Sequence, residues 1–377
     1  MILIITSKRD GHVNGVATAL DKAGVPWVRV NTEDTPRNLE IALEPSTGTG
    51  TVVIKDSGYA FVLDAVDAVW YRKPEPVDLS HFELDTAGLD YIEAEFREIL
   101  DGLYALLQRV FWINNPLTSR LAHRKMLQLN VARRVGFQTP RTVITNHIEK
   151  ALAFAEDCGW NLAIKSLGSI SVTTHRPDGA VQFGIFTRRI AKEDLLALQE
   201  KIPYMPTVFQ AYVEKRYELR VTVVGRQIFA CKIESQAHEL TREDMRFDVR
   251  SLRHEIIECP EITDKLLAYM QAFHLNFGCF DIAVSTNGTY VFFECNPNGQ
   301  YAWIEEMTGA PISQAIANML IQNHTGPVGH SDHTEPLASK PLDDHGGVYK
   351  VGDPRVHKAW MNGYTLAREG MYLYLSD

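Results

Sequence analysis

Residues 277–300 contain two carboxylates and a carboxamide whose spacing would place them on one face of a hairpin: Asp281, Glu294 and Asn296. Two runs rich in strand-forming residues flank an Asn-Gly dipeptide, which is typical of a two-residue turn. If the strands pair directly across that turn, Asp281 lies opposite Glu294, and Asn296 shares their face. Oxygen donors grouped in this way are typical of sites for a hard divalent cation such as Mg²⁺.

The register of this hairpin depends on the turn at Asn287-Gly288, where we expect Thr286 to pair with Thr289. The opposite face of the hairpin then carries apolar side chains and is expected to face the core. These side chains are Phe280, Ile282, Val284, Val291, Phe293 and Cys295.

The two opposed carboxylates should repel each other. At about 5 Å across a strand pair the repulsion is roughly 3 kcal/mol at an effective dielectric of about 20. A bound Mg²⁺ would remove this cost, because the ion takes carboxylate oxygens and completes its shell with water and phosphate oxygens. The alternative is a solvated hairpin face with a shared proton or a nearby lysine.

The spacing of Asp281, Glu294 and Asn296 resembles the magnesium-binding triad of ATP-grasp ligases. The longer run FECNPNGQYAWIEEMTGAPIS resembles the microviridin-type peptide maturases, also called graspetide synthetases, which close ester or amide bonds between side chains of a ribosomally made precursor peptide. The resemblance implies an α/β ATP-grasp fold with an N-terminal Rossmann-like pre-ATP-grasp domain. It also implies ATP and Mg²⁺ as cofactors and a precursor peptide with a leader segment as partner.

The same resemblance assigns nucleotide contacts along the chain. It implies that two lysines contact the nucleotide, Lys125 and Lys165. The adenine would be held by the linker segment Gln210, Ala211, Tyr212 and Val213, and the ribose by Glu218. Arg220 matches the cation that neutralises the transferring phosphate.

Two further cations are candidates for catalytic roles, and each depends on an open point. Lys232 lies on the opposite face from Arg220 if the hairpin 220–233 has a two-residue turn, and on the same face if its loop has three residues. A phosphate role for Lys232 requires the longer loop. Arg250, in a D-x-R pattern, is the candidate for the substrate carboxylate by resemblance, whereas Arg72 in VWYRKP is as well explained as a surface residue.

Composition favours a chain that binds neither nucleic acid nor an anionic membrane surface. The 377 residues carry a formal net charge of -9 and are long enough for two or three compact units. The five cysteines are scattered without metal-ligand spacing, as expected of free thiols in a reducing compartment. No apolar run is long enough for a membrane span and the N-terminus does not match a signal peptide, so we expect the cytoplasm.

The periodicity of the chain predicts three parts: residues 1–117, 118–325 and 326–377. The first starts with a buried strand at 1–6, a helix ending near Gly24 and a strand at 25–30, followed by a hairpin at 51–63, a strand at 68–72 and a helix at 91–110. The second starts with one helix from Ser119, which Gly136 ends, and also contains helices at 262–273 and from Pro311. The third is a linker and an aromatic-rich extension.

The function that we expect is ATP-dependent closure of side-chain crosslinks in a precursor peptide, by a homodimer. One rival is a ligase of the same fold that joins free small molecules or adds glutamate to a protein tail. The other is a peptide-binding scaffold that uses nucleotide only as a structural ligand.

Overall fold

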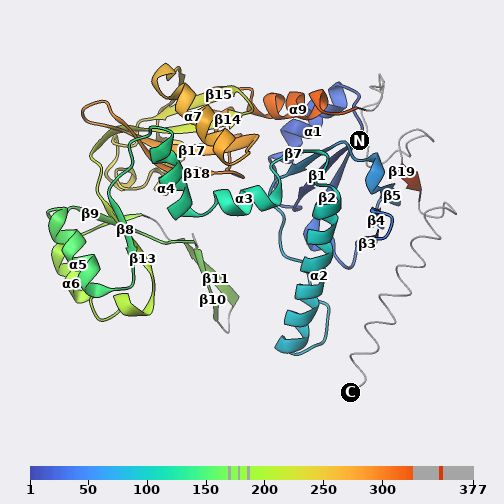
Figure 1. The fold of residues 1–377 in the computed structure, drawn as a ribbon, viewed down its shortest axis with the longest axis horizontal. Coiled ribbons are helices and arrows are strands. Elements are labelled where there is room, and N and C mark those ends of the chain that lie inside the picture. The colour runs from blue at the N-terminus through green and yellow to red at the C-terminus, as the bar shows by residue number, and fades with distance from the viewer. Residues whose placement is uncertain (169–170, 177–178, 185–186, 326–347, 351–377) are drawn as a thin grey trace. The chain divides into compact units, whose positions relative to one another are not determined.

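The computed structural model describes residues 1–168, 171–176, 179–184, 187–325 and 348–350 (Figure 1). The chain divides into two compact units. Unit 1 consists of Met1–Thr118, Leu275–Phe277 and Pro311–Asp377, and unit 2 of Ser119–His274 and Gly278–Ala310. The three-part division at 117 and 325 stays a prediction, and α9 (Ile312–Gln322), which we expected in the second part, packs on α1 (Val13–Lys22) in unit 1.

Unit 1 is built on a parallel sheet, which confirms the Rossmann-like prediction. The sheet order is β2 (Trp27–Asn31), β1 (Ile2–Thr6), β6 (Ala68–Tyr71) and β7 (Phe111–Ile113). All five residues of β1 are buried, because a central parallel strand is covered on both faces.

A second sheet in unit 1 is antiparallel and contains the predicted hairpin. Its order is β19 (Val348–Lys350), β5 (Tyr59–Val62), β4 (Thr49–Ile54) and β3 (Leu39–Glu44). Helix α2 (Thr86–Leu106) begins five residues before the predicted start, because the Asp85 side chain caps it by accepting a hydrogen bond from Gly88 N at 2.8 Å.

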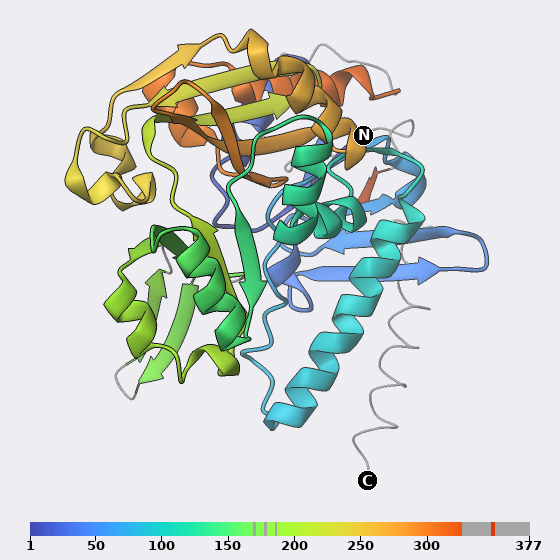
Figure 2. The ribbon, with the colours of Figure 1, turned by 60° about the vertical axis from the view of Figure 1, so that its left-hand side comes forward.

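Unit 2 contains two antiparallel sheets that supply the side chains of the site (Figure 2). The first has the order β12 (Arg188–Ile190), β9 (Leu162–Lys165), β13 (Thr207–Ala211) and β8 (Thr142–Thr145), and its apolar cluster includes residues of α5 (Ile148–Asp157) and α6 (Lys192–Ala197). The second has the order β16 (His254–Ile257), β15 (Gln227–Ile233), β14 (Lys215–Val224), β17 (Phe277–Ser285) and β18 (Tyr290–Asn296). The remaining elements are the hairpin β10 (Ser171–Arg176) and β11 (Gly179–Gly184), and helices α7 (Pro260–Ala272) and α8 (Ala302–Thr308).

The predicted single helix from Ser119 is instead two helices, α3 (Pro116–Ala122) and α4 (Lys125–Arg134). The backbone leaves the helical region at Arg124, with φ of -76° and ψ of 102°, so Lys125 becomes the first residue of α4. Gly136 has a φ of +92°, which confirms its role as the residue that ends the helix.

The hairpin β17–β18 pairs Asp281 with Glu294, as predicted, but its turn is longer than predicted. Ser285 N donates to Thr289 O at 3.0 Å, so residues 286–288 form the loop and Thr286 does not pair with Thr289. The Ser285 side chain favours this loop, because its Oγ accepts a hydrogen bond from Thr289 N at 3.1 Å.

A β-bulge then restores the predicted register. Ile282 pairs with Phe292 whereas Asp281 pairs with Glu294, so Phe293 is the extra residue. Phe292 is fully buried and occupies the core position that we had assigned to Phe293. Phe293 is half-buried and lines the pocket described below.

Helix α4 holds the strand that carries Glu294 through one buried amide. Gln128 Nε2 donates to the carbonyl oxygen of Cys295 at 2.7 Å, and Cys295 N donates to Gln128 Oε1 at 3.1 Å. The side chain therefore completes the hydrogen bonds of the residue next to Glu294.

Within the described residues, no helix is long and apolar enough to cross a membrane.

Replacing Gln128 with Leu should lower the free energy of unfolding by about 2–4 kcal/mol, because two backbone groups of Cys295 lose their partners in a buried place. Chemical denaturation measures the change. Gln271→Leu, at an exposed position of α7, is the matched control and should change stability by less than about 0.5 kcal/mol. Equal losses in the two variants would contradict the assigned role.

Candidate active site

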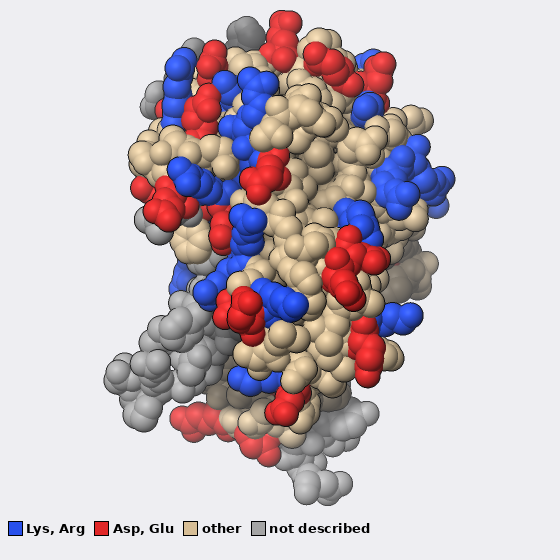
Figure 3. Space-filling view, turned by 90° about the vertical axis from the view of Figure 1, so that its left-hand side faces the viewer, with Lys and Arg blue, Asp and Glu red and all other residues tan. Residues whose placement is uncertain are grey.

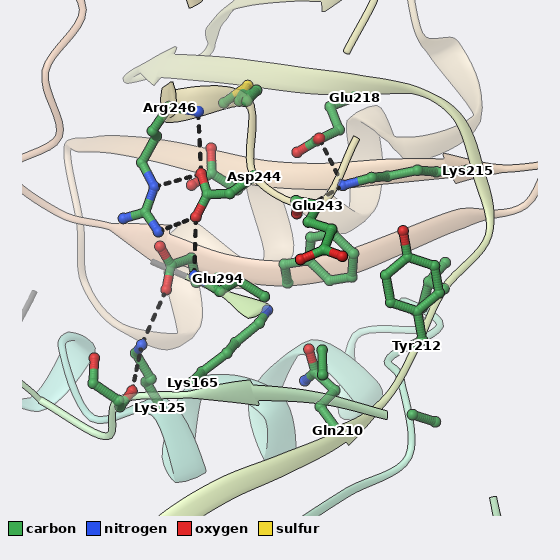
Figure 4. A pocket seen from close by; sticks show the side chains of 18 residues that line it. Lys125, Lys165, Gln210, Tyr212, Lys215, Glu218, Glu243, Asp244, Arg246 and Glu294 are labelled. Carbon is green, nitrogen blue, oxygen red and sulfur yellow. Dashed lines mark hydrogen bonds and ion pairs between the residues drawn. The ribbon is translucent and has the colours of Figure 1, made fainter. Parts of the chain in front are cut away.

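A pocket in unit 2 brings together side chains from both sheets and from α4 (Figure 4). β9 contributes Ala163 and Lys165, β13 contributes Gln210 and Ala211, and β14 contributes Lys215 and Glu218. Asp281 comes from β17, and Phe293 and Glu294 come from β18. The loop between β15 and β16 adds Glu243, Asp244, Met245 and Arg246. The remaining lining residues are Lys125, Ser166, Thr187, Tyr212 and Val213.

Two lysines approach the carboxylate end of the pocket from different elements. Lys125 Nζ donates to Ser166 O at 3.1 Å and lies 3.6 Å from Glu294 Oε2. Lys165 Nζ lies 4.5 Å from the centroid of the Phe293 ring. The bulge explains this contact, because the extra residue turns an aromatic ring toward the pocket.

The carboxylate pair is already compensated by side-chain cations. Arg220 Nη1 donates to Asp281 Oδ1 at 2.8 Å, whereas Glu294 faces Lys125. Burial alone would raise the pKa of Glu294, but Lys125, Lys165 and the nearby arginines outweigh it, so the pKa is lowered. Burial and the Glu294 charge raise the pKa of Asp281 against the effect of Arg220. Repulsion by itself therefore does not require a metal ion.

Arg220 is held on both sides, although it does not itself line the pocket. Its Nη2 donates to Gln300 O at 3.0 Å, in the turn after β18. A Cβ on Gly299 would lie 2.4 Å from Cys279 Cβ and 3.0 Å from Arg220 Nη2, so only glycine permits this close approach. The turn therefore fixes the guanidinium against Asp281.

The predicted linker lies along the pocket as expected. Gln210 Nε2 donates to Thr142 Oγ1 at 3.0 Å, and the N–H groups of Ala211 and Tyr212 donate to Arg141 O and Asn161 O. In the described part of the chain, the N–H of Val213 has no such partner. Val213 is therefore the residue of the linker whose N–H is available to a ligand.

Glu218 lines the pocket as expected, but it has a partner that the sequence analysis missed. Lys215 Nζ donates to Glu218 Oε1 at 2.7 Å, and both side chains are buried. Lys215 follows the linker by two residues, which is the sequence signal that could have indicated it.

Besides Arg220, three predicted residues lie outside the pocket lining. Val224 pairs with Gln227, so the hairpin has the two-residue turn, and Lys232 lies opposite Leu219 on the other face from Arg220. Lys232 pairs with Glu234 at 2.7 Å, so the phosphate role expected of it is wrong. Arg250 is exposed and lies 3.2 Å from Glu306 on α8. Asn296 accepts a hydrogen bond from Asn298 N at 3.0 Å.

Arg246 is a second cation of the pocket that the sequence analysis missed. It belongs to an earlier D-x-R pattern, Asp244-Met245-Arg246, four residues before the one that contains Arg250. Asp244 is buried, accepts hydrogen bonds from Arg246 N and Nε at 3.1 and 2.8 Å, and forms an ion pair with Nη2. These contacts lower the pKa of Asp244 against burial. Asp244 Oδ2 also accepts from Thr187 N at 3.2 Å, so one carboxylate holds two walls of the pocket.

The mixture of charges fits a metal–nucleotide complex. Four cationic and five acidic side chains line the pocket, so a bare polyanion would face many carboxylates. A polyanion that arrives with a divalent cation matches both signs, because carboxylates are ligands for Mg²⁺ and lysines contact phosphate.

Burial lowers the pKa of Lys165 to about 8, with Lys125 and Lys215 adding to the shift and Glu294 opposing it. In the unfolded chain this lysine has its ordinary pKa of 10.5, so Lys165 should make the free energy of unfolding rise with pH between 8 and 10.5. A bound nucleotide favours the protonated form, so ADP affinity should fall as pH rises through 8. Calorimetric titration over this range measures the affinity.

Lys165→Arg is the control for this pH dependence, because a guanidinium stays protonated throughout the range. Its ADP affinity should change less with pH than that of the unchanged protein. Identical profiles for the two proteins would show that Lys165 does not titrate in the site.

Comparison with known proteins identifies relatives of this chain. Residues 1–120 match the MvdD pre-ATP grasp domain. No curated protein matches the chain in sequence. Macrocyclase MdnC from Microcystis aeruginosa MRC, solved with its precursor peptide MdnA, is 30% identical, with a TM-score of 0.76 over 86% of this chain and 100% of that chain.

Two further structures are similar. A RiPP-associated ATP-grasp ligase from Chryseobacterium gregarium, solved with ADP and a leader and core peptide, is 27% identical, with a TM-score of 0.76 over 86% of this chain and 97% of that one. The ATP-grasp ligase PsnB, solved with a precursor variant, Mg and ADP, is 21% identical, with a TM-score of 0.68 over 85% and 98%, and shows the fold alone. Given its identity to MdnC over the whole of that enzyme, the chain belongs to the family of ATP-grasp ligases for ribosomally made peptides that includes this macrocyclase.

Proposed function

We propose that this protein uses ATP and Mg²⁺ to activate a side-chain carboxylate of a ribosomally made precursor peptide and to close ester or amide crosslinks within that peptide. The observation that carries the proposal is the pocket in which three lysines, Arg246 and the opposed carboxylates Asp281 and Glu294 meet beside the linker of an ATP-grasp fold. Family membership supports a peptide as the acceptor.

The proposed roles come from the resemblance to ATP-grasp ligases, and the pocket lining supports them. Lys125 and Lys165 would hold the phosphates, Val213 N–H and Gln210 would contact the adenine, and Glu218 would bind the ribose. Asp281 and Glu294, with Asn296, would hold Mg²⁺, which when bound neutralises charge on the transferring phosphoryl group. Arg220 keeps Asp281 oriented.

The reaction needs no nucleophilic side chain of the enzyme. The substrate carboxylate attacks the γ-phosphorus of ATP, the bond to ADP breaks, and an acyl-phosphate forms. A hydroxyl or amine of the same peptide then attacks the acyl carbon, loses its proton and releases phosphate. Cations of the site lower the barrier by stabilising charge on the phosphoryl oxygens.

Arg246 takes the place of Arg250 as the candidate that holds the acceptor carboxylate. It lines the pocket and its guanidinium is oriented by the buried Asp244, whereas Arg250 is largely exposed and pairs with Glu306. A guanidinium held in this way can bind a carboxylate in bidentate fashion.

A precursor leader as partner, a homodimer and a cytoplasmic location stay predictions. The five free cysteines support a reducing compartment.

Purified protein with ATP, Mg²⁺ and a candidate precursor should yield peptide products that are lighter by one water for each bond formed, as measured by mass spectrometry. A short neighbouring reading frame rich in Thr, Ser, Asp and Glu is the candidate to test. If free amino acids alone support as much ADP release as the precursor does, the protein is a small-molecule ligase.

Replacing Glu294 with Gln should lower Mg²⁺-dependent ADP release by roughly a hundredfold or more, because the metal loses a charged ligand. Stability without metal should fall by no more than about 1 kcal/mol, since the carboxylate is partly exposed and its cations lose one partner. Glu255→Gln, on the edge strand β16 and outside the pocket, is the control and should leave ADP release unchanged. Normal turnover in Glu294→Gln would exclude the metal role.

A further inference from the structure

A second hollow in unit 2 lies outside the nucleotide pocket. It runs between the outward face of α4 and residues 136–144, and we call it the α4–β8 groove. Met126 and Leu129 line it from the helix, and Ile144 lines it from the strand. Met126 is 59% exposed and lies in the same groove as the apolar side chains of Leu129 and Ile144, so the groove offers apolar surface as well as charge.

The charge of the α4–β8 groove is of one sign. Three arginines line it, Arg133, Arg134 and Arg141, and no Asp or Glu is among its described lining residues. Arg141 lies 3.3 Å from Asp157 outside the groove, whereas Arg133 and Arg134 are exposed and have no ion pair in the described part of the chain. Over the face drawn in Figure 3, by contrast, acidic and basic side chains are interspersed. In a chain with a net charge of -9, a groove whose charged lining residues are all arginines favours an acidic partner.

The backbone of the α4–β8 groove can pair with a further strand. β8 is the last strand of its sheet and pairs with β13 on one side. Among the described strands none pairs with its other edge, so that edge presents N–H and C=O groups. An extended peptide that adds to such an edge gains main-chain hydrogen bonds and places alternate side chains toward each wall.

We infer that the α4–β8 groove binds an extended peptide segment in which acidic residues alternate with apolar ones, pairing its backbone with β8 and its carboxylates with Arg133 and Arg134. This binding role rests on the proposed function, because the occupant of the groove is then an acidic segment of the peptide substrate. The groove also adjoins the nucleotide pocket, because Thr142, on the groove wall, accepts the hydrogen bond of Gln210.

The test uses a short fluorescent peptide in which Glu and Val alternate. Fluorescence anisotropy measures its affinity for the full chain in the absence of ATP. The Arg133→Gln/Arg134→Gln protein should bind this probe about tenfold more weakly, because two charge-assisted contacts are lost. Arg216→Gln/Arg226→Gln changes the net charge equally at exposed positions of unit 2 outside the groove, and should bind as the unchanged protein does. A Lys–Val peptide should not bind.

Two further measurements separate the peptide from other polyanions. Asn130→Glu places a negative charge on the exposed groove wall without loss of helix propensity, so it should weaken binding of the probe. Asn130→Gln adds no charge and should leave this binding unchanged. Two further probes are each N-methylated on every second residue, one in each of the two possible registers. The probe whose methyl groups replace the N–H groups that face β8 should no longer bind.

Several results would overturn the inference. One is equal binding of the probe by the Arg133→Gln/Arg134→Gln protein and by the Arg216→Gln/Arg226→Gln control. Another is equal binding of the two N-methylated probes. The third is that a heparin fragment, which has no peptide backbone, binds as tightly as the probe. Because probe binding needs no turnover, it can fail while ring closure succeeds, and ring closure can fail while the probe binds.

Discussion

The site depends on the opposed carboxylates of Asp281 and Glu294, held on neighbouring strands in a place that water reaches only in part. Two like charges at this separation persist only if cations are brought to them. Arg220 comes from β14 and Lys125 from α4. The β-strands, the helix and the turn at Gly299 are therefore organised around one electrostatic requirement.

Hydrogen bonds to the backbone hold this arrangement in place. Gln128 satisfies both backbone groups of Cys295, next to Glu294, and Gln300 O accepts from Arg220. The two backbone groups of Cys295 are buried, so a change in register would leave them without a partner. The carboxylates are thus positioned by neutral side chains and backbone groups as much as by their charged partners.

Asp244 connects two walls of the pocket. The same carboxylate holds the guanidinium of Arg246 and the N–H of Thr187. Glu243 accepts from Arg189 N at 3.1 Å and reinforces the contact between the 243–246 loop and the strand β12. A loop that is tied down in this way can present a fixed cation to a substrate carboxylate, which favours transfer chemistry that relies on positioning rather than on an enzyme nucleophile.

Local pattern was sufficient for the parts of the site that lie on regular elements. The alternation along 277–296 determined which hairpin faces carry carboxylates, and the match to ATP-grasp ligases identified Lys125, Lys165 and the linker. The Asp281–Glu294 pairing was nevertheless reached through two offsetting deviations, a longer turn and a bulge, because the Ser285 side chain and the packing of Phe292 decide the register.

Only the tertiary structure decided which cations enter the pocket. Lys232 and Arg250 have the right residue type, but a two-residue turn places the first on the far face and the second pairs with Glu306 at the surface. Lys215 and Arg246 were missed because their selection depends on the partners Glu218 and Asp244. A side chain's charge is written in the sequence, whereas the burial and the counter-charge that give it a role come from segments far apart in the chain.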